Sequence, residues 1–131
     1  MSDYPDFEGN KSKLFTVADW SAVEATDKNL EGSNTFLAAG RSIVIDYVIP
    51  SGSTFYICQW GFEIEKDTFV IGELTSYDGA TSTYLGVNGG KPGNALSLSK
   101  PVAITGGDHC RLLLSVGAAG TGRGFIGGYL I

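Results

Sequence analysis

Residues 54–64 read Thr-Phe-Tyr-Ile-Cys-Gln-Trp-Gly-Phe-Glu-Ile, and this stretch decides the fold class. Apolar side chains recur in it at every second position: Tyr56, Cys58, Trp60, Phe62 and Ile64. The positions between them include Gln59, Gly61 and Glu63. Alternation at period two is typical of an antiparallel strand with one face on a core and one toward solvent. The stretch therefore predicts a half-buried β-strand.

Further stretches carry a strand signal, and turn residues separate them at short intervals. They span residues 41–49, 68–76, 81–87, 95–99, 102–105, 109–116 and 125–131. Asp78-Gly79 is a hairpin signal, and Pro101 indicates an edge or a break. Residues 125–131 are apolar at both alternating sets of positions, which predicts a central strand. About eight strands at such spacing are typical of a sandwich or a barrel.

A weak internal repeat indicates two related halves. Ile49-Pro-Ser-Gly52, leading into residues 55–57, matches Ile104-Thr-Gly-Gly107, leading into residues 110–112. Two similar four-strand units are how a double Greek key is built. The predicted fold is therefore all-β, an antiparallel jelly-roll-like β-sandwich of about eight strands with an extended N-terminal arm. We expect residues 1–34 to form the arm and residues 35–131 the sandwich.

Shared register predicts which side chains fill the core. We expect the core to include Tyr56, Trp60, Phe62, Leu112, Leu114, Phe125 and Tyr129. In residues 41–49 the predicted inward face holds Ile43, Ile45, Tyr47 and Ile49. The arm is polar by comparison. Within it, Ser21-Ala-Val-Glu24 has the spacing of a helix capping box, and residues 29–34 are expected to form a loop.

Charge and composition narrow the class of protein. The 131 residues carry nine Lys and Arg against 14 Asp and Glu, a net charge of −5. A nucleic-acid-binding protein needs a basic footprint, so we expect no nucleic-acid partner. No apolar run reaches the ~18 residues of a membrane span, and the acidic start is unlike a secretory signal. Synthesis in a cytoplasm, with no membrane partner, is expected.

Candidate reactive residues are few, and each has a simpler structural reading. His109 is the one histidine, whereas zinc and non-haem iron sites usually use two or three. A serine triad around His109 lacks a Gly-x-Ser-x-Gly elbow. Cys58 and Cys110 are expected as buried thiols, although a disulfide between apposed strands stays open. The sequence thus predicts no catalytic residue, metal site or cofactor.

The acidic and glycine-rich clusters also have simpler structural explanations. Glu63 and Glu65, with Glu73 expected nearby, could serve glycoside hydrolysis, or bind calcium together with Asp67 or Asp78. A solvated strand face explains these acids more simply. Residues 117–124 lack the Gly-Lys-Ser/Thr ending of a phosphate loop and lead into a strand. We expect that segment, and residues 86–93, to be loops.

Three stretches resemble a known class of viral protein. They are VIPSGSTFYICQWGFEI (48–64), KPVAITGGDHCRLLLSV (100–116) and GFIGGYLI (124–131). Their succession of strands and turns is similar to small jelly-roll proteins of bacteriophage and other virus particles, which decorate or cement the capsid or form parts of fibres. The resemblance covers about residues 41–131. It implies a jelly roll, no cofactor and oligomers on a symmetry axis of the shell, and it supplies no binding residues.

The expected function is that of a non-enzymatic structural protein of a virion, a phage capsid decoration or cement protein that binds the shell through its oligomer and its N-terminal arm. We expect a homotrimer, made in the host cytoplasm, that contacts the major capsid protein or another virion protein. Ordering a polar arm costs ~1–2 kcal/mol of backbone entropy per residue, so contacts must compensate. Aromatic and apolar residues dominate interfaces, and the expected anchors are Tyr4, Phe7, Leu14, Phe15 and Trp20.

Two other functions remain open on the same fold. One is a carbohydrate-binding module or lectin-like receptor-binding domain, with an exposed aromatic pair or a calcium site in the loops at residues 78–94 or 117–124. The other is a small enzyme, which would place His109 beside a carboxylate and a nucleophile in one pocket. Fold alone does not choose between them.

Overall fold

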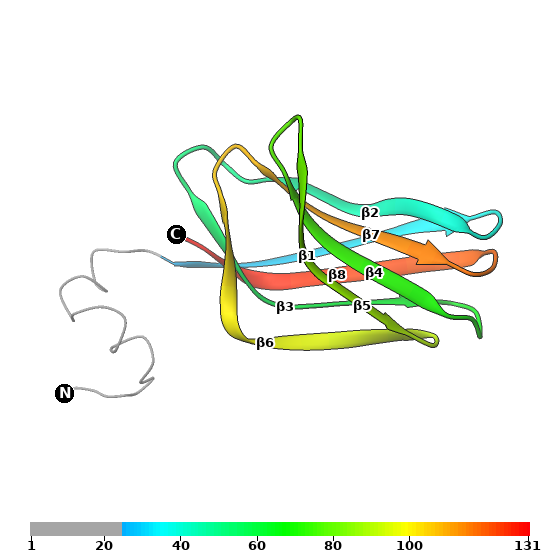
Figure 1. Cartoon of the computed structure of the whole chain (residues 1–131). Coiled ribbons are helices and arrows are strands. Elements are labelled where there is room, and N and C mark those ends of the chain that lie inside the picture. Colours follow the sequence, from blue (N-terminus) through cyan, green and yellow to red (C-terminus); the bar gives the residue numbers. More distant parts are fainter. Residues whose placement is uncertain (1–24) are drawn as a thin grey trace.

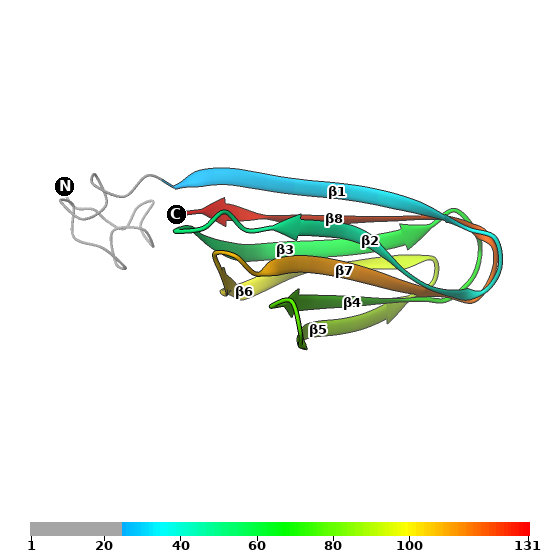
Figure 2. The ribbon, with the colours of Figure 1, turned by 90° about the horizontal axis from the view of Figure 1, so that it is seen from above.

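The computed structural model describes residues 25–131, which form two antiparallel sheets packed face to face (Figure 1). The strands, in chain order, are β1 (Thr26–Phe36), β2 (Gly40–Val48), β3 (Thr54–Ile64), β4 (Val70–Tyr77), β5 (Ser82–Gly90), β6 (Gly93–Thr105), β7 (His109–Val116) and β8 (Gly120–Leu130). Figure 2 shows β1 and β5 at opposite sides of the sandwich.

The strand order is that of a jelly roll. One sheet has the order β1-β8-β3-β6 and the other β2-β7-β4-β5. Apart from the hairpin β4–β5, each strand is followed in the chain by a strand of the opposite sheet. Two interlocked Greek keys produce this alternation. The predicted fold class, an antiparallel jelly-roll-like sandwich of eight strands, is confirmed.

The internal repeat corresponds to two turns at one end of the sandwich. Gly52, in the turn from β2 to β3, has φ 87°, and Gly107, in the turn from β6 to β7, has φ 91°. The Gly107 N–H donates to the Ile49 carbonyl over 2.8 Å, and the Ile49 N–H donates to the Asp108 carbonyl over 2.9 Å. The repeated segments are thus equivalent turns that lie side by side (Figure 1).

The core lies between the two sheets and is apolar. Its buried side chains are Phe36, Val44, Ile45, Ile49, Phe55, Ile57, Trp60, Phe62, Ile64, Val70, Leu74, Ile104, Cys110, Leu112, Leu114, Val116 and Ile126. Of the predicted core residues, Trp60, Phe62, Leu112 and Leu114 are therefore confirmed. The prediction is wrong for Tyr56, Phe125 and Tyr129. The two tyrosines stack on each other outside the core, with ring centroids 5.2 Å apart, and Phe125 is 37% exposed.

A β-bulge in β3 explains the misplaced Tyr56. The register of β3 shifts between Ile57 and Gln59 against both of its neighbours. Phe55 and Ile57 point into the core before the shift, and Trp60 does so after it. An extra residue in one strand moves all following side chains to the opposite face. The apolar alternation that starts at Tyr56 therefore changes face at Cys58.

A second bulge, in β2, has the same effect. The register shifts between Ile43 and Ile45, and the extra residue Val44 is buried together with Ile45. Ile43, predicted to face the core, is instead 39% exposed.

Three predicted boundaries are also corrected. Residues 29–34, expected as a loop, belong to β1, so the boundary at 34/35 falls inside a strand. Residues 95–99 and 102–105 are parts of one edge strand, β6, which contains Pro101. Most of the expected loop 117–124 lies in β8, which begins at Gly120. β8 is a central strand, as predicted. The capping box at residues 21–24 lies outside the described residues.

The difference between inward and outward phenylalanines gives a test of the register. Phe62 is 3% exposed, so Phe62→Ala should lower the free energy of unfolding by about 3–5 kcal/mol. Phe125 is partly exposed, and Phe125→Ala should cost about 1–2 kcal/mol. Urea unfolding of both variants measures the two values. Equal losses would show that the register of β3 against β8 is wrong.

Candidate functional site

The two outer surfaces of the sandwich differ in chemistry. Side chains alternate across each strand, so each sheet has one face on the core and one facing outward. On the sheet β2-β7-β4-β5 the outward face has exposed apolar residues. We call this surface the apolar face and define it by five side chains that are 36–59% exposed: Ile43, Phe69, Ile71, Tyr84 and Val87.

The apolar face extends over all four strands, and Glu73 interrupts it between Leu113 and Val87. Ile43 is opposite Leu113 on β7, Leu113 is opposite Glu73 on β4, and Glu73 is opposite Val87 on β5. Ile71 is opposite Gly89, and a Cβ built at Gly89 would lie 2.7 Å from the Phe69 ring. The Phe69 ring therefore covers the backbone at Gly89 and extends the apolar face to the start of β4.

Charged groups on this surface are paired with one another. Arg41 Nε and Nη2 donate to Glu73 Oε1 over 2.9 and 2.7 Å. The hydrogen bond to Glu73 raises the pKa of Arg41. Asp46 lies beside Arg111, with Arg111 Nε 3.3 Å from Asp46 Oδ2. Two cations and two carboxylates therefore cancel, and the apolar face has a net charge near zero.

His109 occupies one end of the same sheet. Its Nδ1 is 2.7 Å from Asp46 Oδ1, and its ring meets Tyr77 edge-on with centroids 5.5 Å apart. The Arg111 guanidinium lies 4.0 Å from the centroid of the Tyr77 ring. Burial raises the pKa of Asp46, but hydrogen bonds from His109 and Arg111 outweigh it, and the pKa is lowered overall.

The His109–Asp46 pair supplies two of the three parts of a catalytic triad. In residues 25–131 no hydroxyl or thiol group hydrogen-bonds to His109. The sheet β1-β8-β3-β6 has a groove on its outward face, and the lining of that groove does not include His109. The arrangement that the alternative of a small enzyme would require, with base, carboxylate and nucleophile in one pocket, is therefore not assembled by the described residues.

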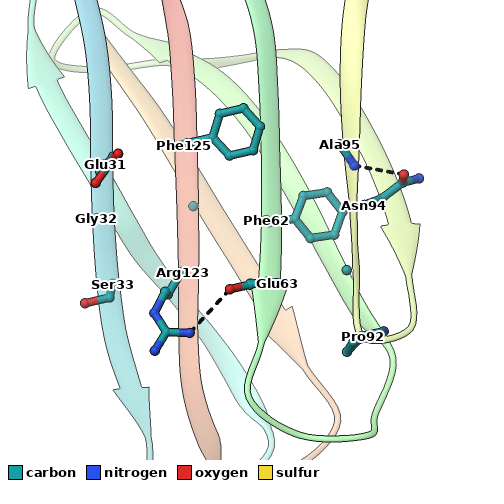
Figure 3. Close-up of a pocket in the computed structure, with 12 residues that line it drawn as sticks. Glu31, Gly32, Ser33, Phe62, Glu63, Pro92, Asn94, Ala95, Arg123 and Phe125 are labelled. Atoms are coloured by element: carbon teal, nitrogen blue, oxygen red, sulfur yellow. Dashed lines mark hydrogen bonds and ion pairs between the residues drawn. The ribbon is translucent and has the colours of Figure 1, made fainter.

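A groove of about 870 Å³ lies on the outward face of the other sheet, β1-β8-β3-β6 (Figure 3). Its lining is formed by Glu31, Gly32, Ser33, Phe62, Glu63, Pro92, Gly93, Asn94, Ala95, Arg123, Gly124 and Phe125. The Phe125 ring extends from β8 over Gly61 of β3, where a Cβ would lie 2.3 Å from the ring. Glycine at position 61 therefore gives the ring its place on the sheet.

Arg123 bridges the acidic residues at one end of this groove. Its Nη1 is 3.3 Å from Glu63 Oε2, and its Nη2 donates to Glu65. The hydrogen bond to Glu65, with the charge of that carboxylate, raises the pKa of Arg123. The paired acids Glu63 and Glu65 thus share one cation. Glu73, expected near them, lies instead on the apolar face of the opposite sheet, so that expectation is wrong.

Asn94 lines the groove at the edge strand β6, but it is opposite the buried Phe62, so its side chain is on the inward side of the sheet. Its Nδ2 donates to Asn88 Oδ1 over 2.9 Å, and its Oδ1 accepts from the Ala95 N–H over 2.8 Å. These bonds hold the amide toward β5 of the other sheet, and Figure 3 shows the bond to Ala95.

The remaining sequence-based candidates have structural roles or lie outside the described part. Cys58 and Cys110 are both free. Desolvation raises the pKa of Cys110 to about 12, which keeps the thiol protonated at neutral pH. Asp67 pairs with Lys91 over 3.8 Å. The expected anchors Tyr4, Phe7, Leu14, Phe15 and Trp20 all precede residue 25 and are outside the described residues.

Residues 25–131 contain neither a metal-binding cluster nor a membrane-spanning helix. No cluster of three or more His, Cys, Asp or Glu side chains suited to a metal ion was found there. The same residues include no helix with the length and hydropathy that a membrane crossing requires.

Sequence comparisons found no matching family model and no matching curated protein. Among solved structures, the crystal structure of FLHE is similar with a TM-score of 0.41 and 7% identity, covering 79% of this chain and 97% of that one. Structures of infectious bursal disease virus, Gx and Gt strains, each have a TM-score of 0.34, at 10% and 12% identity. Each covers 82% of this chain, which spans 37% and 32% of the two viral chains.

The lowered pKa of Asp46 predicts a pH-dependent contribution to stability. The unfolded carboxyl titrates near pH ~3.9, so the contribution is present above that pH and is lost as the pH falls through the lower folded pKa. Because the side chain is 38% exposed, Asp46→Asn should cost less than about 1 kcal/mol at pH 7. Urea unfolding at pH 7 and near pH 2 measures the difference, which should vanish in acid. Asp67→Asn is the control and should change neither value, whereas a loss for Asp46→Asn that persists in acid would contradict the electrostatic origin.

Proposed function

We propose that this protein is a non-enzymatic structural protein of a virus particle, a phage capsid decoration or cement protein that assembles as a homotrimer. The observation that carries the proposal is the apolar face. Single exposed apolar residues are ordinary, but a contiguous apolar patch marks an interaction site. Ile71 and Val87, with the aromatic rings of Phe69 and Tyr84, form such a patch over β4 and β5, and Ile43 lies beyond the Arg41–Glu73 pair on β2.

Charge supports a second copy of the chain as the occupant of this face. The protein has a net charge of −5, so two copies repel one another through most of their surfaces. On the apolar face, Arg41 is paired with Glu73, and Arg111 with Asp46. A contact between copies made here buries apolar area without bringing unpaired like charges together. Aromatic residues and arginine are also the types that interfaces favour.

Closed symmetry is the usual result when identical chains associate. The threefold form is proposed because residues 48–64 and 100–116 resemble decoration proteins, whose oligomers lie on symmetry axes of the shell. The virion is then the proposed location. The partner beyond the trimer is the major capsid protein or another virion protein, reached through Tyr4, Phe7, Leu14, Phe15 and Trp20.

Self-association through the apolar face is tested by adding charge to it. Val87 is 57% exposed on the edge strand β5, so Val87→Glu leaves the core intact but buries a carboxylate in the interface. We expect a trimer for the unaltered chain and at least a tenfold weaker association for the variant, measured by sedimentation equilibrium. Leu37→Glu, in the turn after β1 and 90% exposed, is the control and should still form trimers. A monomeric wild-type protein would refute the proposal.

The contribution of the N-terminal residues is tested by removing them. Because β1 begins at Thr26, a chain that starts at Ala25 keeps all eight strands. We expect it to keep its thermal midpoint within about 2 °C, since a loss of 1 kcal/mol would shift the midpoint by about 4–8 °C in a domain of this size. Its trimer should dissociate at a concentration at least tenfold higher. An unchanged dissociation constant would remove residues 1–24 from the trimer contact.

A further inference from the structure

The groove on the sheet β1-β8-β3-β6 differs from the apolar face in being both aromatic and polar. Two cross-strand rows form it. One row runs Glu31, Phe125, Gly61, Ala95, and the next runs Ser33, Arg123, Glu63, Gly93. From this arrangement we infer that the groove is a binding site for a neutral glycan chain, a function separate from the proposed assembly through the opposite sheet.

Phe125 provides the apolar part of such a site. Its ring is held over Gly61, yet the side chain remains 37% exposed. A pyranose ring has a face of C–H bonds that is apolar and slightly positive, and the face of an aromatic ring is negative. A sugar ring therefore packs well on a phenylalanine that is fixed below and open above. Figure 3 shows Phe125 between β8 and β3 with its ring toward the groove.

Hydrogen-bond donors and acceptors surround the Phe125 ring. Glu31 is the cross-strand neighbour of Phe125 on β1, and its carboxylate can only accept hydrogen bonds. Arg123, already held by Glu63 and Glu65, has further N–H groups that can donate. The Ser33 hydroxyl, opposite Arg123 on β1, can do both. Sugar hydroxyls both donate and accept hydrogen bonds, so this lining can bond to them, and the ligand needs no charge.

The groove lies on a strip long enough for several sugar units. Tyr129 is four residues beyond Phe125 on β8, on the same face, and stacks on Tyr56 of β3. Four strand residues span about 13 Å. Between the two aromatic positions is Gly127, where a Cβ would lie 2.8 Å from the Gln59 side chain. An aromatic group at each end with a glycine and an amide between them fits an oligosaccharide better than a single sugar.

The charge of the strip and the position of the groove narrow the ligand class. Asp27, Glu31 and Glu63 face outward along it, with Arg123 between the two glutamates, so uronic and sialic acids are repelled. An extended peptide would seek unpaired backbone groups at a sheet edge. The centre of this groove is over β8 and β3, whose backbones are paired on both sides. A neutral glycan is therefore favoured over an acidic glycan or a peptide strand.

Native gel electrophoresis of the full chain in gels with dissolved polysaccharides tests this inference. The neutral probes are hydroxyethylcellulose, galactomannan, arabinoxylan and dextran, and the acidic probe is polygalacturonate. We expect at least one neutral polysaccharide to retard the protein and polygalacturonate to have no effect. Retardation by polygalacturonate alone, or by none of the five probes, would overturn the inference while leaving the trimer proposal untouched.

Three variants locate the binding. Phe125→Ala should weaken retardation at least tenfold in polysaccharide concentration. Ala95→Arg removes no packing, because Ala95 is exposed, and fills the groove beside Gly61, so it should weaken retardation as much. Leu37→Ala, exposed in a turn outside both outer faces, is the control and should bind like the unaltered chain. Full binding by both groove variants, or equal loss in the control, would overturn the assignment.

Discussion

Two of the register shifts in the sheets, the β-bulges at Val44 in β2 and at Cys58 in β3, determine which side chains these strands bury. A strand has only two faces, so one extra residue exchanges them for the rest of the strand. Because of the bulge at Cys58, Phe55 and Ile57 before it and Trp60 after it all reach the core. The same shift places Tyr56 on the outside, where it meets Tyr129. Core packing and the chemistry of the outer face thus depend on one local irregularity.

The bulges are also the features of the fold that the sequence pattern does not predict. Period-two patterns and glycine turns predicted the strands from β2 onward, including the repeat at Gly52 and Gly107. They did not reveal the face change in β3, because Phe55 and Ile57 are apolar as well and the alternation continues through Cys58. β1 was not predicted because it is an edge strand whose core contacts are Leu30 and Phe36, and two apolar residues give no sustained alternation. The direction of Phe125 could not be predicted in a strand that is apolar on both faces.

Opposite placement of the two outer surfaces lets one small domain serve two kinds of contact. The apolar face belongs to the sheet β2-β7-β4-β5 and the groove to β1-β8-β3-β6, with the core between them. Association of copies through the first surface would leave the second accessible. A trimer would then present three grooves, and linked weak sites bind a repetitive ligand far more tightly than one site does. Modest stacking on Phe125 is thus compatible with useful affinity for a polymeric glycan.

The placement of large and small side chains along β8 supports a binding role for the outward face of this strand. A Cβ at the inward Gly124 would lie 2.4 Å from Leu112, and one at the inward Gly122 would lie 3.1 Å from Leu114. Leucines of the opposite sheet therefore fill the space that β8 leaves empty. Ile126 is the fully buried large side chain of β8, whereas Arg123 and the two aromatic residues Phe125 and Tyr129 point outward. Stability alone favours burying an aromatic ring, since that contributes about 1.5–3 kcal/mol. Because β8 directs glycines inward and aromatic rings outward, it lacks that contribution to stability. The outward rings instead shape the outer surface of the sheet.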